Sequence, residues 1–572
     1  MRVLLAPSSD RKEFWSLQTT DDEGRPVGEP TATRDLAETV RRLEVDRPRW
    51  VWPSTARVHA ALLRAGVRVD RCHDVAMTEA LLRAHEERPA ATVSDADPGS
   101  SSDSAQTSLF DPEIAPGTDA EARSGPGGEP EAGAEPIDRD EIGRLIAAHT
   151  DQLTRIRQAR TISPGFGLLV AAESAAALAA VEMGRAGLPW RADIHDRVLT
   201  DLLGERPRHG GRPPRLQELA VAVAEALEGE SRRSGGPRAG GAPGVNVDSP
   251  MEVLRAFRRQ GVQLETTRAW ELKTVDHPAV EPLLRYKELA RLHTANGWAW
   301  REQWVRDGRF RPEYVVGGVV SGRWATKGGG ALQIPRAVRA SVVADPGWAL
   351  VVADAGQLEP RVLAALSGDP GMVAATQAGD LYAALATQAL GRPEARDEAK
   401  IALLAAMYGA RANTPAMAAL TRRFPRALDL LEAAARTGED GGVVRSVLGR
   451  TCPPPNPNWQ QGPETVLSAR SRARGRFTRN FVIQASAADW ANTVVAGLRQ
   501  RLIALEPVGE PGPELVFFQH DEVVVHTPSA LVDAVIDAVT TSGEEATRLV
   551  VGERGVRIPF TATPVASYAD KH

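Results

Sequence analysis

Two acidic residues stand where hydrophobic strands end, and this placement constrains the fold more than any other feature of the chain. The run Trp348–Asp354 is apolar except for its last residue, which predicts a buried strand that ends in a carboxylate. The segment from Leu515 to His526 predicts a hairpin of two hydrophobic strands whose tight turn carries Asp521. A carboxylate beside buried strands is costly unless it is paired or bound to a metal. The fold must therefore give both acids a partner.

If both strands belong to one sheet, Asp354 and Asp521 converge and offer hard oxygen ligands that suit Mg²⁺. A site for two such ions suits in-line phosphoryl transfer, because it stabilises both the attacking and the leaving oxygen. Strand ends also often carry an aspartate that forms a turn. Either acid alone is more simply explained in that way.

Arg396, Lys400, Leu404 and Tyr408 are spaced by four and form a stripe on a helix predicted over residues 396–408. Its two cations would bind phosphates, and its aromatic ring would stack near a base. The chain keeps six lysines against 63 arginines, so Lys400 is informative. Unlike arginine, an ammonium group can shift its pKa and donate a proton to a leaving pyrophosphate. A solvated helix face that ends in tyrosine is the alternative explanation.

The same spacing recurs at Arg476, Asn480 and Gln484, on a predicted helix that continues through Ala485–Val495. These three side-chain types donate hydrogen bonds to base edges and sugars. A capping cluster at the start of the helix is the alternative explanation.

Five ordered motifs resemble the family A DNA polymerases, the DNA polymerase I family. The run Asp354-Ala-Gly-Gln-Leu-Glu-Pro-Arg361 resembles the family's D-Y-S-Q-I-E-L-R. The others are Arg396-x3-Lys400-x7-Tyr408-Gly409, Gln519-His520-Asp521-Glu522, Ser321-Gly-Arg323 with Leu332-Gln-Ile-Pro335, and Arg476-x3-Asn480-x3-Gln484. The resemblance covers about residues 165–572.

The resemblance implies a role for each matching residue. Asp354 and Asp521 would hold two Mg²⁺ ions, with Mn²⁺ as an alternative, and Lys400 would give the proton to pyrophosphate. Glu359 would be the steric gate that excludes a ribose 2′-hydroxyl. The expected nucleotide contacts are Arg396, Lys400, Leu404, Tyr408, Gln357, Glu359 and Tyr382, and the expected DNA contacts are Arg323, Arg476, Asn480, Gln484 and His520.

The chain departs from the family pattern at several positions. Ala355 and Gly356 replace the usual Tyr-Ser, Pro360 interrupts the turn from strand to helix, and Leu404 replaces an aromatic residue. The stretch after Gly409 is shorter than usual. These changes bear on rate and fidelity more than on the type of reaction.

The fold class implied is α+β, a right-hand polymerase with palm, fingers and thumb. It is preceded by a degenerate α/β domain of the RNase H-like 3′–5′ exonuclease type. The expected ranges are 1–164 for the exonuclease-like domain with a disordered acidic insert at 89–136, 165–314 for the thumb, 315–370 and 480–572 for the palm, and 371–479 for the fingers.

The exonuclease-like domain lacks the acids that its chemistry needs. Four acids around two metals are required, and neither the opening strand at Val3 nor the stretch Val51–His59 contains one. Asp74 and Asp151 resemble remnants of the set. Half a site cannot hold two divalent ions, so this domain is predicted to be inactive.

Charge is distributed unevenly along the chain. The net charge is −5, but residues 91–136 hold ten acids and one base, which leaves the rest of the chain at +4. A mildly basic body with an acidic tether is compatible with DNA. Within the tether, Gln106-Thr-Ser-Leu109-Phe110 resembles a peptide that grips the sliding clamp, so Gln106, Leu109 and Phe110 are predicted to bind it. A chance pentapeptide is the alternative.

Two cysteines, Cys72 and Cys452, exclude a disulfide scaffold and a cysteine-ligated zinc cluster. No apolar run approaches the ~18 residues of a membrane span. The sequence therefore predicts a monomer in the cytoplasm, associated with the nucleoid and without a membrane partner.

The predicted function is template-directed DNA synthesis, in which deoxynucleotides are added to a primer 3′-hydroxyl with release of pyrophosphate. Repair or gap filling without working proofreading is the expected setting. Alternatives are a catalytically weak protein that binds primer-template DNA, a bifunctional enzyme with residual 3′–5′ exonuclease activity, and a single-subunit RNA polymerase, against which Glu359 argues.

Overall fold

The structure of the chain is a computed structural model. It describes residues 1–8, 14–87, 139–208, 210–228, 245–327, 334–409, 414–456, 458–459, 461–507, 509 and 511–571. The predicted clamp-binding residues Gln106, Leu109 and Phe110 lie outside the described residues. The motif residue Leu332 also lies outside them.

The first sheet has the strand order β3-β2-β1-β4-β5. Strands β4 and β5 follow β1 in parallel, whereas β2 and β3 are antiparallel additions. Residues Val3–Ala6 are all buried, as expected for a central strand covered on both faces. The strands are β1 (Arg2–Pro7), β2 (Trp15–Thr20), β3 (Thr31–Thr33), β4 (Arg49–Trp52) and β5 (Arg71–Asp74), and the helices are α1 (Leu36–Glu44), α2 (Thr55–Arg64), α3 (Val75–His85) and α4 (Arg139–Ile162).

The second sheet, order β12-β13-β11-β14, is entirely antiparallel. Its side chains alternate between two cores, because Val351 and Ala353 face one core while Leu350 and Val352 face the other. The strands are β11 (Trp348–Ala355), β12 (Glu514–Gln519), β13 (Glu522–Pro528) and β14 (Phe560–Val565). Both strands predicted to carry the acids therefore belong to one sheet.

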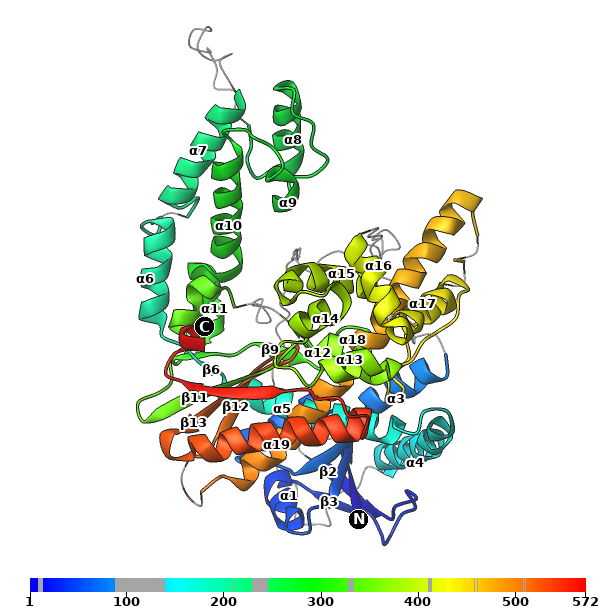
Figure 1. The fold of residues 1–572 in the computed structure, drawn as a ribbon. Helices are drawn as coiled ribbons and strands as arrows, with labels where there is room; N and C mark the ends of the chain where they lie inside the picture. The colour runs from blue at the N-terminus through cyan, green and yellow to red at the C-terminus, as the bar shows by residue number, and fades with distance from the viewer. Residues whose placement is uncertain are drawn as a thin grey trace.

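Three long helices, α5 (Phe166–Ala186), α18 (Glu464–Ala504) and α19 (Val532–Val551), pack with this sheet in the larger core. Helix α5 also contacts β5 of the first sheet and the helix α2, so it links the two sheets. In Figure 1, α19 lies beneath the second sheet and the N-terminal strands lie below α19.

Helix α5 corrects one expectation from the sequence. By length and composition it is apolar enough to cross a membrane, so the statement that no apolar run approaches a membrane span was wrong. Much of its most apolar stretch is buried inside the protein. A helix covered by a sheet on one side and by α18 on another has few positions left for polar residues.

A second core unites the remaining helices of the first half of the chain. Figure 1 shows α6, α7, α8 and α10 rising as an arm at one end of the second sheet. These elements are α6 (Ala192–Leu203), α7 (Pro214–Glu228), α8 (Pro250–Arg259), α9 (Ala269–Leu272), α10 (Val280–Asn296) and α11 (Trp298–Trp304), with strands β6 (Leu188–Pro189), β7 (Val305–Arg306) and β8 (Arg309–Phe310). The predicted limits of thumb, palm and fingers stay predictions, and α5 packs with the larger core rather than with this arm.

A group of shorter helices rises on the other side of the second sheet (Figure 1). They are α12 (Leu358–Ser367), α13 (Pro370–Ala375), α14 (Leu381–Leu390), α15 (Arg396–Tyr408), α16 (Pro415–Arg423) and α17 (Pro425–Glu439). The remaining elements are β9 (Glu313–Val315), β10 (Ala325–Lys327) and the 3₁₀ helices η2 (Arg336–Ser341), η3 (Pro393–Ala395), η4 (Ser529–Leu531) and η5 (Tyr568–Lys571).

Candidate active site

The two predicted acids meet at one end of the second sheet. Asp354 of β11 pairs in register with Glu522 of β13, and Asp521 lies in the turn just before β13. The Ala355 amide donates to the Asp521 carbonyl oxygen at 3.1 Å, which fixes the turn against the end of β11. The convergence predicted from the two strand ends is therefore present.

The two carboxylates lie in different surroundings. The Asp354 side chain is 46% exposed. Burial and the nearby negative charge of Asp354 raise the pKa of Asp521 to about 7. An acid with a raised pKa beside a second acid is a group that would gain from a bound cation.

A positive charge from η5 lies beside Asp354 and Glu522. The Lys571 ammonium donates to Glu522 Oε2 at 2.6 Å and lies 3.5 Å from Asp354 Oδ2. The Tyr568 hydroxyl donates to the other oxygen of Glu522. Sequence analysis did not identify Lys571, although its being one of only six lysines was an available signal.

The carboxylates of Asp354 and Asp521 are suited to Mg²⁺, which binds through one or two carboxylates and completes its shell with water and substrate phosphates. Within the described part of the chain, no group of three or more His, Cys, Asp and Glu side chains is placed to hold a metal ion. The protein therefore offers a partial shell at this position, which a phosphate-bearing substrate could complete.

Gln357 links the strand end to the helices above it. Its backbone is left-handed, with φ of 60°, which is unusual for a residue other than glycine. The side chain holds it there, because the amide donates to Asp380 Oδ1 at 2.9 Å and accepts from the Leu381 amide at 2.8 Å. A strained residue held on both sides indicates a position with a functional constraint.

Asp380 also holds the first cation of the predicted stripe. Arg396 Nε donates to Asp380 Oδ2 at 2.5 Å, and its guanidinium lies 5.8 Å from the centre of the Tyr382 ring. Tyr382 itself is only 6% exposed. The three predicted residues Gln357, Tyr382 and Arg396 are thus gathered around Asp380, which was not among the residues predicted from the sequence.

Helix α15 carries the stripe as predicted, from Arg396 to Tyr408. Lys400 is exposed, and among the described residues it has no hydrogen bond or ion pair. Leu404 is half-buried on the same face. Lys400 is therefore available to an anion, whereas Arg396 must first leave Asp380.

Glu359, in the first turn of α12, is held from two sides. The Tyr408 hydroxyl donates to Glu359 Oε2 at 2.9 Å, and the Arg323 guanidinium binds Glu359 Oε1. The Glu359 side chain is 14% exposed. Pro360 falls in the first turn of the helix, where a missing N–H costs little, so α12 still begins at Leu358. The structure brings three predicted residues into one hydrogen-bonded group.

The residues Arg476, Asn480 and Gln484 lie within α18, which begins at Glu464. The alternative of a capping cluster at a helix start was therefore wrong, because the helix starts three turns earlier. Arg476 packs against Gly409, where a side chain would collide with its Cγ at 2.7 Å. Asn480 keeps a buried Oδ1 without a partner among the described residues.

His520 precedes Asp521 in the two-residue turn, with φ of 55°. Burial, together with the positive charge of Arg323, lowers its pKa to about 4. Its Nδ1 is buried without a partner among the described residues. A neutral imidazole with a free ring nitrogen can accept or donate one more hydrogen bond at the strand end.

Two buried arginines support the site and were not predicted. Arg361 is fully buried and donates to carbonyl oxygens only, among them those of Gly356 at 2.8 Å and Thr376 at 2.5 Å. Arg450 binds Glu173 at 2.7 Å and Asp489 at 3.1 Å, which ties α5 to α18. Arg361 stood inside a recognised motif, so its presence was visible in the sequence but its role was not.

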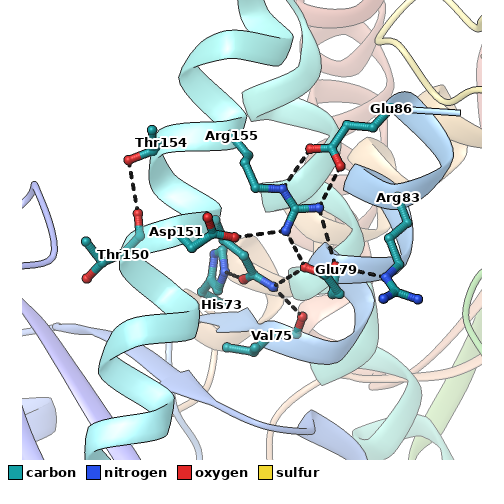
Figure 2. Close-up of polar contacts among 10 residues, drawn as sticks. His73, Val75, Glu79, Arg83, Glu86, Thr150, Asp151, Thr154 and Arg155 are labelled. Atoms are coloured by element: carbon teal, nitrogen blue, oxygen red, sulfur yellow. Dashed lines mark hydrogen bonds and ion pairs between the residues drawn. The ribbon is translucent and has the colours of Figure 1, made fainter. Parts of the chain in front are cut away.

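A second cluster of acids lies far from this site, in the first 162 residues. Figure 2 shows Arg155 of α4 at its centre, bound to Glu79 at 2.7 Å, Glu86 at 2.7 Å and Asp151 at 3.0 Å. Burial opposes ionisation of Glu79, but the hydrogen bonds and charge of Arg155 outweigh it and lower the Glu79 pKa. The carboxylates of this cluster already have a cation.

Asp74, predicted as a remnant of an exonuclease site, is buried and has structural partners. Its carboxylate accepts from the Met77 amide at 3.0 Å and from the Thr55 amide at 2.6 Å, so it caps α3 and fixes the start of α2. Asp151 pairs with Arg155, as Figure 2 shows. The structure therefore does not join these two acids into one site.

Comparison with known proteins adds three findings. Residues 250–553 match the family model described as DNA polymerase family A. Two relatives are the thermostable DNA polymerase I of Thermus thermophilus, 29% identical over 328 residues, and DNA polymerase I of Chloroflexus aurantiacus, 26% identical over 313 residues. The matches cover 53% and 50% of this chain but only 38% and 32% of those proteins.

Among solved structures, the chain is similar in fold to the POL domain of Pol1 from M. smegmatis, in complex with a DNA primer-template and dNTP. The TM-score is 0.68 at 18% identity, and the match covers 99% of this chain and 95% of that domain. The likeness extends over both sheets of the chain.

Proposed function

Because this chain belongs to DNA polymerase family A, we propose that it catalyses template-directed addition of deoxynucleotides to a primer 3′-hydroxyl, with release of pyrophosphate. The matched region, residues 250–553, contains the strand β11, the helix α15 and the hairpin that together form the candidate site. Its relatives are named as DNA polymerases, and the similar solved structure holds a primer-template and dNTP.

One observation carries the proposal. The carboxylates of Asp354 and Asp521 converge at one end of a sheet, and helix α15, which carries the exposed Lys400, is tied through the Tyr408–Glu359 hydrogen bond to the helix that follows Asp354. Carboxylates that accept a cation and an exposed ammonium on the adjoining helix are groups that a triphosphate with its bound metal requires.

Family A DNA polymerases are generally dependent on divalent metal ions, and we assign the ligands here to Asp354 and Asp521. Bound Mg²⁺ would supply electrostatic stabilisation of the attacking and leaving oxygens. The protein's own part is to keep both carboxylates at the strand ends, through the β11–β13 register and the hydrogen bond from Ala355 to Asp521.

Arg396 and Lys400 are the proposed ligands of the triphosphate. Lys400 is free to bind it directly, and it is placed one helical turn from Arg396. We assign to Lys400 the proton that the pyrophosphate leaving group takes up, because an ammonium can donate it and a guanidinium cannot.

Glu359 is the proposed gate against ribonucleotides. Tyr408 and Arg323 fix its carboxylate, so it cannot easily turn away from a 2′-hydroxyl. This argues against a single-subunit RNA polymerase. Leu404, on the face that leads to Tyr408, is assigned to packing beside the incoming nucleotide.

The DNA-binding residues are proposed beside the C-terminal end of α15, where Arg476 packs against Gly409. Arg476, Asn480 and Gln484 follow one face of α18, and His520 stands beside Asp521. Buried donors and acceptors without partners, as at Asn480 and His520, are suited to base edges or sugars.

We propose that the N-terminal unit does no proofreading, because Asp74 caps a helix and Asp151 is paired with Arg155. Work in repair or gap filling, as a monomer in the cytoplasm at the nucleoid, follows as the proposed setting. Binding to the sliding clamp through Gln106, Leu109 and Phe110 completes the set of proposed partners.

Primer extension on a 5′-labelled primer-template with Mg²⁺ tests the function. Wild type and Asp521→Ala are compared with deoxynucleotides, with ribonucleotides and with no nucleotide. Extension with deoxynucleotides alone, lost in Asp521→Ala, is the expected result. The primer should stay intact without nucleotide, and shortening there would show a working exonuclease.

Two outcomes would replace the proposal. Failure of wild type to extend, despite tight binding to the same DNA, would identify a primer-template-binding protein. Equal extension with ribonucleotides would mean that Glu359 is not a gate.

A further inference from the structure

Asp354 and Glu522, at the end of the second sheet, already have a cation from the chain, and this cation is largely shielded from solvent. The Lys571 side chain is 10% exposed, and its ammonium lies 2.6 Å from Glu522 and 3.5 Å from Asp354. Burying an ammonium is costly unless it is paired. Its placement is therefore a built feature rather than the chance position of a surface lysine.

The segment that carries Lys571 is fixed by packing. Tyr568, three residues earlier, is 2% exposed and belongs to the second core. Its amide donates to the Val342 carbonyl oxygen at 3.0 Å, and the Arg339 guanidinium lies 4.7 Å from its ring centre. Lys571 is thus held at the end of a short anchored helix, within reach of both acids.

The distances from the Lys571 ammonium to Glu522 and to Asp354 differ, and this difference indicates different roles for the two acids. Lys571 is in close contact with Glu522, whose second oxygen is taken by Tyr568, and only loosely in contact with Asp354. Both carboxylate oxygens of Glu522 therefore already accept a hydrogen bond from the protein. The Asp354 side chain is 46% exposed, and its Oδ1 has no hydrogen-bond partner among the described residues.

We propose that Lys571 is the resident counter-ion of the sheet-end acids: its ammonium compensates Asp354 and Glu522 while no divalent ion is bound, and it leaves Asp354 but stays on Glu522 when one binds. Lys571 is a positioning residue in this scheme. It lowers the electrostatic repulsion between Asp354 and Glu522 when no divalent ion is bound, and it keeps Glu522 from becoming a ligand of the metal. This inference rests on the proposed polymerase site.

Binding of Mn²⁺ alone to the full chain tests it, measured from the electron paramagnetic resonance signal of free Mn²⁺. Removing a positive charge a few ångströms from a cation site should strengthen binding, so we expect Lys571→Met to bind Mn²⁺ about tenfold more tightly than wild type. The matched control is Lys327→Met, because Lys327 is 71% exposed and pairs with Glu313 at 3.0 Å on β9. Its Mn²⁺ affinity should equal that of wild type.

A second readout needs no metal. In EDTA, Lys571→Met should unfold at a lower temperature than wild type, and Mn²⁺ should raise its midpoint by more than it raises that of wild type. Lys571→Arg, which keeps the charge, should restore the wild-type values in both measurements. Lys571→Gln replaces the methionine variant if that variant does not fold.

Assignment of the signal to this site comes from the double variant Lys571→Met with Asp521→Ala, which should lose the gain in affinity. Equal Mn²⁺ affinity in wild type, Lys571→Met and Lys327→Met would overturn the inference, as would a gain that survives in the double variant. Primer extension by the same wild-type preparation separates the two proposals. Without extension the polymerase function fails, whereas extension with unchanged Mn²⁺ affinity removes only the role of Lys571.

Discussion

Two groups of carboxylates in this molecule each contain a cation supplied by the chain, and they differ in how completely that cation satisfies them. In the N-terminal cluster, the Arg155 guanidinium binds Glu79, Glu86 and Asp151 (Figure 2). At the end of the second sheet, Lys571 binds Glu522 at 2.6 Å and lies 3.5 Å from Asp354, and among the described residues it makes no hydrogen bond or ion pair with Asp521.

The pKa values follow this difference. Arg155 lowers the pKa of Glu79 against the effect of burial, while burial and Asp354 raise the pKa of Asp521 to about 7. A planar guanidinium with five donors can close an acid cluster, whereas one ammonium leaves part of its cluster open. Acid content alone therefore does not make a cation site, since every carboxylate of the N-terminal cluster already bonds the same guanidinium.

The largest expected effect separates the two clusters by activity. Asp354→Asn should reduce the rate of primer extension by about 10³-fold or more, because it removes a ligand of the metal that stabilises the transition state. Asp151→Asn should leave the rate within about twofold of wild type. Single-turnover extension with saturating nucleotide measures both, and similar rates for the two variants would remove the distinction.

The next effect is a loss of stability, and it concerns the N-terminal cluster of acids around Arg155. Arg155→Met leaves three carboxylates facing one another and should lower the stability by about 2 kcal/mol, with extension by the folded protein unchanged. The thermal midpoint in 0.15 M salt measures it. Arg83→Met is the control, because within the part of the chain that the structure describes Arg83 bonds only Glu79, at 3.1 Å, and its side chain is 39% exposed. Its loss should be clearly smaller, and an equal loss would mean that Arg155 is not the centre of the cluster.

At the end of the second sheet, removing a charge should raise the stability instead of lowering it. Because the folded pKa of Asp521 is raised from 3.8 to about 7, its protonated form is favoured in the folded state, and this contribution to stability is lost as the pH rises from about 4 to about 7. Asp521→Asn cannot ionise. Without divalent ions it should be more stable than wild type by about 1–2 kcal/mol at pH 8, which raises the melting temperature by about one to two degrees, and the gain should shrink as the pH falls toward 4.

For Glu79 the sign is reversed. Its lowered pKa gives stability that is present above the ordinary carboxyl pKa and lost on further acidification. A pH-independent effect of Asp521→Asn, or one that grows in acid, would contradict the raised pKa.

The smallest effect is on nucleotide binding, and it concerns Arg396, one of the proposed ligands of the triphosphate. Asp380 holds Arg396 at 2.5 Å in an ion pair in which both side chains are more than a third exposed, so the pair is worth little. Asp380→Asn keeps the helix cap at Ala383 and should lower the KM for deoxynucleotides by about threefold with kcat nearly unchanged. Steady-state kinetics measures it.

Asp397→Asn is the matched control, since Asp397 also pairs with Arg396, at 2.9 Å, but is 84% exposed. Its KM should not change. A higher KM in Asp380→Asn would show instead that Asp380 orients Arg396 for the nucleotide.

Much of the second sheet and of the site could be predicted from the sequence. The apolar run that ends at Asp354 and the hairpin around Asp521 are local patterns, and the strands β11, β12 and β13 form where those patterns lie. The stripe from Arg396 to Tyr408 spans α15 from end to end because a period of four is itself a helical pattern. The order of the motifs, which resembles that of the family A DNA polymerases, then predicted that these elements form one site.

Residues whose partners are distant in sequence could not be predicted. Lys571 binds Asp354 across 217 positions, and Arg450 binds Glu173 across 277. Helix α5 was misjudged for the same reason, since its apolar composition serves contacts with a sheet and with α18 that lie far along the chain.

The sequence by itself determined which acids end hydrophobic strands, which helix carries the cationic stripe and which family the motifs resemble, because each depends on neighbours within a few residues. Only the tertiary structure decided which acids are free and which are already neutralised. A carboxylate's pKa and its capacity to bind a metal depend on charges and burial within a few ångströms. In this chain those charges come from Arg155 and Lys571, whose positions are set by the packing of α4 and η5.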